Sequence, residues 1–294
     1  MLQFRRERHL ARTLGHVPPL RPILAAVLLL GLTTGCGEDA PSSTPLPDDV
    51  TIHIDQSRIQ RQGRVVFLRV HNGTKQPLTI ERYVLRSPRF SPVRWSGHEE
   101  IGATYETDLE LTLPKGRCGG DVDARVTLTY RMGDGDERRS TTPAEDVYGN
   151  AVDFADRDCA ESTLQEAAAI TVGDPRVEGD GRGSVLHLPV TLSPSGRRSD
   201  VRFAGFGSTV LFRQAPGSPT AVDVRLDGDP VTLDMRVVPA RCDPHALAED
   251  KVGRLFPVQV RADDVAEGAS FFLPLTQEQK RAFFAYFRSS CGLP

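Results

Sequence analysis

Apolar and polar side chains alternate with a period of two along much of this chain. This pattern restricts the possible folds of the chain more than any other feature of the sequence. Leu109, Leu111 and Leu113 alternate with acidic and hydroxyl residues. The same alternation recurs in three longer sets, at Val126, Leu128, Tyr130 and Met132, at Val222, Val224 and Leu226, and at Val231, Leu233, Met235 and Val237. Strands with one buried and one solvated face produce this period, which is typical of antiparallel sheets. Turns rich in glycine and proline separate the runs, so the sequence predicts an all-β fold.

The two halves of the chain beyond residue 50 resemble one another in the order of their landmarks. Ile52 and Ile54 match Ile170 and Val172 at an offset of 118 residues. Further matches at the same offset are Arg58-Ile59 with Arg176-Val177, Gly63-Arg64 with Gly181-Arg182, and Leu68 with Leu186. Segment 113–118 resembles segment 238–242, and both end in cysteine. An ordered set of this kind predicts an internal duplication.

Many short strands in a copy of about 120 residues resemble the immunoglobulin-like β-sandwich. The order of Trp95 and the cysteines does not follow the antibody pattern, so the resemblance is to the architecture alone. The predicted fold class is therefore all-β, with two tandem immunoglobulin-like β-sandwich domains as an internal repeat, at 50–168 and 169–294, and a short C-terminal helix.

The C-terminal helix has its own start and stop signals. Thr276 and Gln279 form a capping box, segment 277–288 carries good helix formers, and Gly292 ends it. Three phenylalanines give it an apolar stripe: Phe283, Phe284 and Phe287. A weaker helical pattern covers 162–168, at the junction between the copies.

The first residues form an arginine-containing segment, an apolar run at 22–32, and then Thr33-Thr34-Gly35-Cys36. This arrangement resembles the lipobox signal of bacterial lipoproteins, although Thr33 stands where that family more often has an aliphatic residue. The resemblance implies that signal peptidase II removes residues 1–35 as a signal peptide and that Cys36 carries the lipid. The apolar run is too short for a spanning helix, which needs about 20 apolar residues, and an ordinary signal peptide needs no cysteine. Residues 36–49, rich in Pro, Ser and Asp, are predicted to be a flexible tether.

The net charge of the chain after removal of the signal peptide argues against polyanionic partners. The chain from residue 36 has 31 basic and 38 acidic side chains, a formal charge of −7, and no basic block. Such a chain is a poor partner for nucleic acid or anionic head groups. We therefore expect no nucleic acid partner, contact with the membrane through the N-terminal lipid alone, and an extracytoplasmic location in the bacterial envelope.

Four cysteines remain besides Cys36, in a compartment that permits disulfides: Cys118, Cys159, Cys242 and Cys291. The repeat favours one bond within each copy, Cys118 with Cys159 and Cys242 with Cys291, while the spacing alone leaves the other two pairings open.

Motifs that carry chemistry are absent from the sequence. There is no nucleophile elbow, phosphate loop or local zinc motif, so we expect no catalytic residues, metal ligands or cofactor. The strongest metal candidate is Asp243-Pro244-His245 with Glu249 and Asp250, followed by His98-Glu99-Glu100 near Trp95, and each is more typical of a solvated loop. The acidic residues that offer oxygen ligands for calcium are Asp134, Asp136, Glu137, Asp153, Asp156, Asp158, Asp174, Glu178 and Asp180, without EF-hand spacing.

Two classes of function follow from these observations. The first is a lipid-anchored binding or structural module without enzymatic activity, which contacts an unknown protein, glycan or small ligand through the helix at 276–290 or the loops at 88–95. The second is an envelope hydrolase or metal-dependent enzyme with a site near the Asp243–His245 loop.

Overall fold

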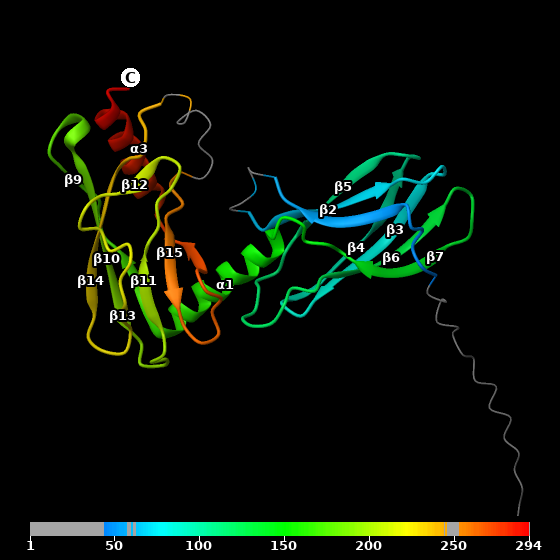
Figure 1. The fold of residues 1–294 in the computed structure, drawn as a ribbon, viewed down its shortest axis with the longest axis horizontal. Coiled ribbons are helices and arrows are strands. Elements are labelled where there is room, and N and C mark those ends of the chain that lie inside the picture. The colour runs from blue at the N-terminus through cyan, green and yellow to red at the C-terminus, as the bar shows by residue number, and fades with distance from the viewer. Residues whose placement is uncertain (1–43, 58–59, 61–62, 244, 246–252, 294) are drawn as a thin grey trace, which may run out of the picture. The chain divides into compact units, whose positions relative to one another are not determined.

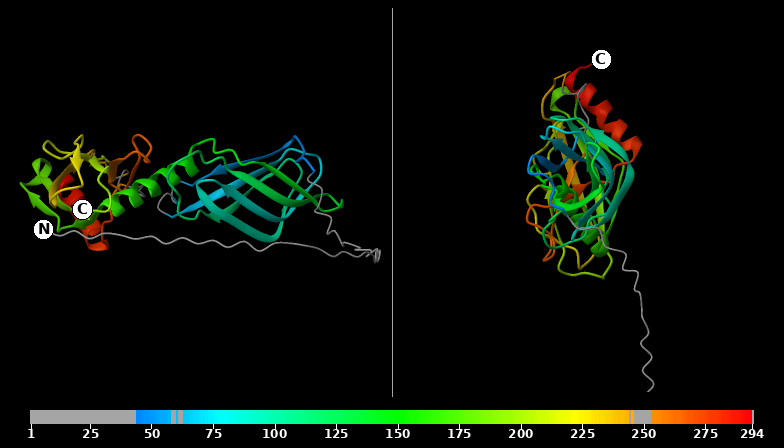
Figure 2. Two further views of the ribbon diagram at one scale, coloured as in Figure 1. Left: turned by 90° about the horizontal axis from the view of Figure 1, so that it is seen from below. Right: turned by 90° about the vertical axis from the view of Figure 1, so that its right-hand side faces the viewer.

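The first half of the chain is a sandwich of two antiparallel sheets. The computed structural model describes residues 44–57, 60, 63–243, 245 and 253–293 (Figure 1). Its first seven strands are β1 (Val50–Asp55), β2 (Val65–Asn72), β3 (Leu78–Ser87), β4 (Phe90–Ile101), β5 (Glu106–Thr112), β6 (Arg125–Met132) and β7 (Arg138–Pro143). They form one sheet in the order β1-β2-β5 and another in the order β4-β3-β6-β7. The views in Figure 2 show the two layers, between which the alternating apolar residues are buried.

The second half repeats this plan. Its strands are β8 (Ala168–Val172), β9 (Arg176–Glu178), β10 (Val185–Pro194), β11 (Arg202–Phe206), β12 (Phe212–Gln214), β13 (Val224–Arg225), β14 (Val231–Pro239), β15 (Pro257–Arg261) and β16 (Ser270–Phe272). One sheet has the order β12-β14-β10-β8, with β9 also paired to β10 at a short 3-10 turn, η2 (Gly181–Gly183), and the other has the order β13-β11-β15-β16. All these pairings are antiparallel.

The repeat predicted from the sequence is confirmed by topology. The path β1-β2-β5 corresponds to β8-β10-β14, and β4-β3-β6-β7 corresponds to β13-β11-β15-β16. Registers differ in detail, because Ile54 pairs with Leu68 whereas Val172 pairs with Val190, four residues beyond Leu186. The all-β, immunoglobulin-like fold is therefore confirmed, and the strands of the second copy have shifted after duplication.

Both predicted disulfides are present at equivalent places. Cys118, in the loop between β5 and β6, bonds to Cys159, and Cys242, between β14 and β15, bonds to Cys291. In each copy the partner cysteine lies on the helix that follows the last strand: α1 (Asn150–Ala167) or α3 (Gln277–Cys291).

Helix α1 is much longer than the predicted 162–168. Its N-terminal turn contains no capping side chain of its own; instead Asp146 accepts hydrogen bonds from the backbone N–H groups of Ala151 and Val152. Its buried surface consists largely of alanine, which gives only a weak hydrophobic period. Ala151, Phe154 and Ala155 belong to the core of the first sandwich, whereas Ala160, Leu164 and Ala167 belong to that of the second. One continuous helix therefore takes part in both cores.

Helix α3 follows its sequence signals closely. Thr276 accepts from the backbone N–H of Gln279, the Gln279 side chain accepts from the backbone of Thr276, and Gly292 ends the helix in a left-handed conformation. Phe283 and Phe287 are fully buried, whereas Phe284 is only partly covered. Neither α3 nor any other helix in the described part of the chain is long and apolar enough to cross a bilayer.

The predicted tether at 36–49 overlaps the fold by six residues. The backbone N–H of Thr44 donates to the carbonyl oxygen of Arg139 at 2.8 Å, and Leu46 packs against the first core. The chain therefore enters the first sandwich along the open edge of β7, and the rest of the predicted tether lies outside the described residues.

Replacing Phe154 with Ala tests how much α1 stabilises the first sandwich. The side chain is 1% exposed, and we expect the free energy of unfolding to fall by about 3–5 kcal/mol, measured by urea denaturation. Val152→Ala on the same helix is the control, because Val152 is 39% exposed and its loss is expected to cost less than about 0.5 kcal/mol. Equal effects of the two substitutions would contradict this packing.

Candidate functional site

The strongest metal candidate of the sequence is not assembled in the described residues. His245 is exposed, and its backbone N–H donates to Asp243 at 2.9 Å, a local turn interaction. Glu249, Asp250 and Cys36 lie outside the described residues. His98 is 66% exposed and lies 3.6 Å from Glu81. Nothing in this arrangement brings ligands together around one point.

The calcium candidates on α1 already have protein partners. Arg64 binds both carboxylate oxygens of Asp158 at 2.7 Å, and Arg89 binds Asp156 at 2.7 Å. Asp158 also accepts from the backbone N–H of Gly116, where a Cβ would lie 2.8 Å from the helix backbone at Ala155. These carboxylates fix the disulfide loop to the helix. Within the described ranges, no group of three potential metal ligands is found.

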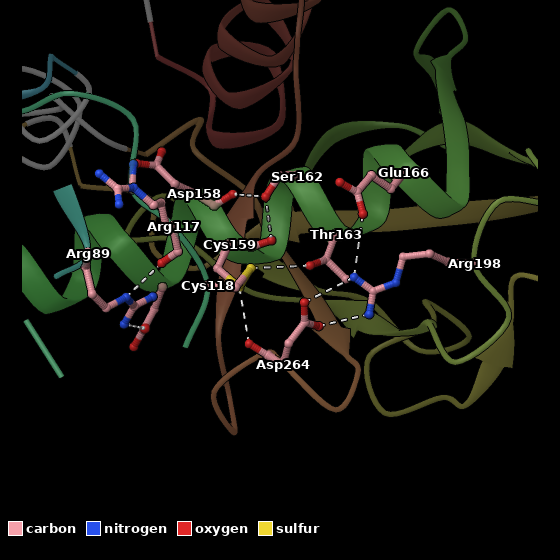
Figure 3. Close-up of a disulfide and its surroundings, with 12 residues drawn as sticks. Arg89, Arg117, Cys118, Asp158, Cys159, Ser162, Thr163, Glu166, Arg198 and Asp264 are labelled. Atoms are coloured by element: carbon pink, nitrogen blue, oxygen red, sulfur yellow. Dashed lines mark hydrogen bonds and ion pairs between the residues drawn. A yellow bond between two sulfur atoms is a disulfide. The ribbon is translucent and has the colours of Figure 1, made fainter. Parts of the chain in front are cut away.

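The Cys118–Cys159 disulfide lies in the middle of this network (Figure 3). The Thr163 hydroxyl lies 3.7 Å from the Cys118 sulfur, and the Asp264 carbonyl oxygen lies 3.3 Å from the Cys159 sulfur, a packing contact because a disulfide has no proton to donate. Arg198 donates to both oxygens of Asp264 and holds the pKa of that carboxyl below its ordinary value, although burial opposes the shift. The surroundings of this bond are structural.

A cavity of about 330 Å³ opens beside α1 and the turn before β16. Its walls carry charges of both signs, from Asp156, Arg157 and Glu267. The Arg157 guanidinium lies over the rings of Phe154 and Phe272, at 4.3 and 5.1 Å from their centres, and burial lowers its pKa. This arginine therefore packs between two rings. The lining of the cavity is mostly polar and also includes Gln56, Asn150, Asp153 and Ser270.

The outer surface of the sheet β4-β3-β6-β7 is the most unusual surface of the first sandwich. Its outward positions follow from the register: Ser96, Arg82, Thr129 and Arg139 form one cross-strand row, and Arg94, Val84, Thr127 and Thr141 form the next. Arg86 and Arg125 are paired in a third row. We call the five exposed arginines of these rows the arginine face: Arg82, Arg86, Arg94, Arg125 and Arg139.

None of these five arginines makes an ion pair with a described residue. Arg86 has only a long hydrogen bond, 3.4 Å, to the Thr127 hydroxyl. Arg86 and Arg125 lie directly opposite one another on neighbouring strands, and like charges in that position destabilise a sheet. This arrangement raises the free energy of the isolated fold and concentrates positive charge on one surface.

The corresponding sheet of the second sandwich shows how the same repulsion is relieved. Arg202 and Arg225 are also opposed across strands. There, however, Arg202 pairs with Asp223 and Arg225 pairs with Asp227. Even in the first sandwich, Arg131 at the far end of the sheet lies 3.7 Å from Glu81 and 3.9 Å from Glu137. Arg261, which lies opposite Arg202 on β15, is exposed and makes no ion pair with a described residue, so the relief is partial and arginines without carboxylate partners also occur outside the arginine face.

A shallow groove of about 610 Å³ runs along one end of the arginine face. Pro88, Phe90 and Pro92 supply apolar walls, and Arg117 stands at its margin, 3.5 Å from the Ser91 hydroxyl. Asp123 is the one acidic residue among those that line it. This end coincides with the loops at 88–95 that the sequence favoured for partner contact.

The sequence from residue 36 contains no basic block, and the basic surface of this sheet is not visible in the linear sequence. No run of consecutive basic residues exists, because each strand contributes only one or two arginines and the register brings them together. The available signal was the period of two, since Arg82 and Arg86 must share a face with each other. Trp95, by contrast, stacks on buried Tyr83 with ring centres 5.5 Å apart, as expected of a core residue.

The outer side of α3, the other predicted contact surface, is less distinctive. Its partly covered Phe284 lies under Arg254, whose guanidinium is 5.8 Å from the ring centre. Arg281 and Arg288 flank it in a shallow depression of about 600 Å³. This surface has one aromatic side chain already covered by a cation.

Comparisons with known proteins add little to this description. No family model and no curated protein matches the sequence. Among solved structures, the chain aligns with a transglutaminase from red sea bream at 11% identity and a TM-score of 0.25, over 76% of this chain and 30% of that one, and so spans less than a third of that enzyme. It also aligns with CBD12 from CALX1.2, at 12% identity and a TM-score of 0.24, over 74% of this chain and 83% of that one. The chain also aligns with the BSP domain of a biofilm-associated protein, at 10% identity and a TM-score of 0.19, over 81% of this chain and 60% of that one. Similarities this low carry no argument for or against an activity or a ligand.

Charge reversal at Arg86 tests the repulsion within the arginine face. Arg86→Glu places a carboxylate opposite Arg125, and we expect the free energy of unfolding to rise by about 0.2–1 kcal/mol at low salt, with the gain falling as salt is added. Arg131→Glu is the matched control: it places a third carboxylate beside Glu81 and Glu137 and is expected to destabilise the fold. A loss of stability in both variants would show that the face is not repulsive.

Proposed function

We propose that this protein is a lipid-anchored, extracytoplasmic binding module whose arginine face binds an anionic partner. The observation that carries the proposal is the set of five exposed arginines on one sheet that have no carboxylate partner among the described residues. Arginine guanidinium groups present planar, paired donors that match phosphate, sulfate and carboxylate oxygens.

Two further observations support the location. The lipobox-like segment ending in Cys36 implies a lipid at the N-terminus of the processed chain. The two disulfides are typical of an oxidising, extracytoplasmic compartment. Neither observation depends on the arginine face, so location and binding can be tested separately.

A binding role also accounts for what surrounds the arginine face. Its outward neighbours include Thr127 and Thr141, whose hydroxyls share a hydrogen bond and have no base as a hydrogen-bond partner among the described residues. The alternative, an enzyme with a site near the Asp243–His245 loop, has no specific observation in its favour, since His245 is exposed and its contact with Asp243 is local.

The anionic preference is tested by retention on immobilised heparin, a sulfated polyanion, as the probe. The chain from residue 36 with Cys36→Ser is expected to bind, and the triple variant Arg86→Ser/Arg94→Ser/Arg125→Ser is expected to bind about tenfold or more weakly and to elute at lower salt. Arg131→Ser is the control, because that arginine is already paired with two carboxylates. Retention of the triple variant like that of the parent would refute the binding role of the face.

The lipid anchor is tested by Cys36→Ala in the full chain. We expect the variant to remain unprocessed or mis-sorted and to leave the detergent phase on phase separation, because no sulfur remains to carry the lipid. Thr33→Leu, which restores the aliphatic residue of the lipobox, is the control and is expected to stay in the detergent phase. Normal processing and partition of Cys36→Ala would disprove the lipid anchor.

A further inference from the structure

The tether enters the fold beside the arginine face. The backbone N–H of Thr44 donates to the Arg139 carbonyl at 2.8 Å, and the Tyr130 hydroxyl lies 3.4 Å from the Pro45 carbonyl. Arg139 belongs to the same cross-strand row as Arg82. The first described residues therefore run along the edge of the sheet that carries all five arginines.

The length of chain before that point limits how far the face can move from the lipid. Thr44 lies eight positions after Cys36, with seven residues between them. Eight residue steps span at most about 29 Å. A lipid at Cys36 would thus hold the arginine face within a few Debye lengths of the bilayer surface, the Debye length being about 8 Å at physiological ionic strength.

We propose that the arginine face docks the first sandwich onto the anionic phosphate head groups of the membrane that holds the lipid. This inference rests on the proposed lipid anchor and identifies the anionic partner as the bilayer surface. From the spacing of strands and residues, the five arginines cover an area about 14 Å on a side. A surface of this size can contact several phosphate head groups at once, more than a small anionic ligand provides.

The net charge of −7 does not prevent this contact. Carboxylates around the face lie at its margins, at Asp123 and Glu100, while Glu81 and Glu137 are paired with Arg131. Asp48 and Asp49 follow the tether and are exposed. Because charges beyond a Debye length are largely screened, the local excess of arginine governs attraction at the surface. Anchoring also raises the effective concentration of the face at the bilayer, so that individually weak contacts suffice.

The experiment measures binding of the unlipidated chain to vesicles. The chain from residue 36 with Cys36→Ser contains the whole compact unit Pro41–Pro294. It is mixed with sedimentable vesicles of phosphatidylcholine alone or with one third phosphatidylglycerol, at about 0.1 M salt. We expect binding only to the anionic vesicles, weakened about 100-fold in Arg86→Ser/Arg94→Ser/Arg125→Ser and unchanged in Arg213→Ser, which removes an exposed arginine of the second sandwich, with circular dichroism to confirm the fold.

The outcomes separate this inference from the proposed function. Retention on heparin without binding to phosphatidylglycerol vesicles would overturn membrane docking and leave a soluble or polymeric polyanion as the partner. Equal binding to both kinds of vesicle, or full binding by the triple variant, would also overturn it. Failure of the parent chain to bind heparin would overturn both the proposed function and the membrane docking.

Discussion

The packing of helix α1 is the interaction on which the rest of the described structure depends. Phe154 fills the first core and Leu164 fills the second, within a single helix of 18 residues. Arg64 and Arg89 bind its carboxylates from the first sandwich, and Arg198 binds Glu166 and Asp264 at its C-terminal half. Because backbone hydrogen bonds are continuous through a helix, loss of order at one end costs packing at the other. The two sandwiches therefore share a structural element and are not independent modules on a loose linker.

The two disulfides occupy equivalent positions in the two copies but stabilise different parts of the chain. Cys118 lies in the loop before β6, and Cys242 lies in the loop before the corresponding strand, β15. In each copy this cysteine bonds to a cysteine on the helix after the last strand. In the first copy that helix continues into β8 and so becomes the connection between the copies. In the second copy the helix ends at Gly292, and its Phe283 and Phe287 close the core beside Phe212. An equivalent crosslink thus stabilises a connection in one case and a terminus in the other.

Local signals in the sequence predicted the elements whose causes are local. The alternation of Leu109 and Leu111, the capping box at Thr276 and the order of the cysteines each depend on neighbours in sequence or on the repeat. Helix α1 was underestimated because alanine buries little area and because its aspartates suggested ligands, whereas Arg64 and Arg89 are their partners across long stretches of sequence. The arginine face was missed for the same reason, since Arg86 and Arg125 are 39 residues apart and meet only through the register of β3 and β6. Contacts that depend on register cannot be derived from composition.

The two copies differ in how many of their opposed arginines have carboxylate partners. A duplicated sandwich starts with two equivalent sheets, and both now contain arginines opposed across strands. In the second copy aspartates pair with Arg202 and Arg225, whereas Arg261 in the same cross-strand row has no ion pair with a described residue. In the first copy Arg131, on the same strand as Arg125, is likewise paired, so suitable carboxylates do fit on this sheet. Sheet geometry therefore does not prevent neutralisation of the other five arginines. Since like charges in contact raise the free energy of the fold, an anionic surface or ligand that supplies the missing countercharge gives a physical reason for five arginines to remain unpaired.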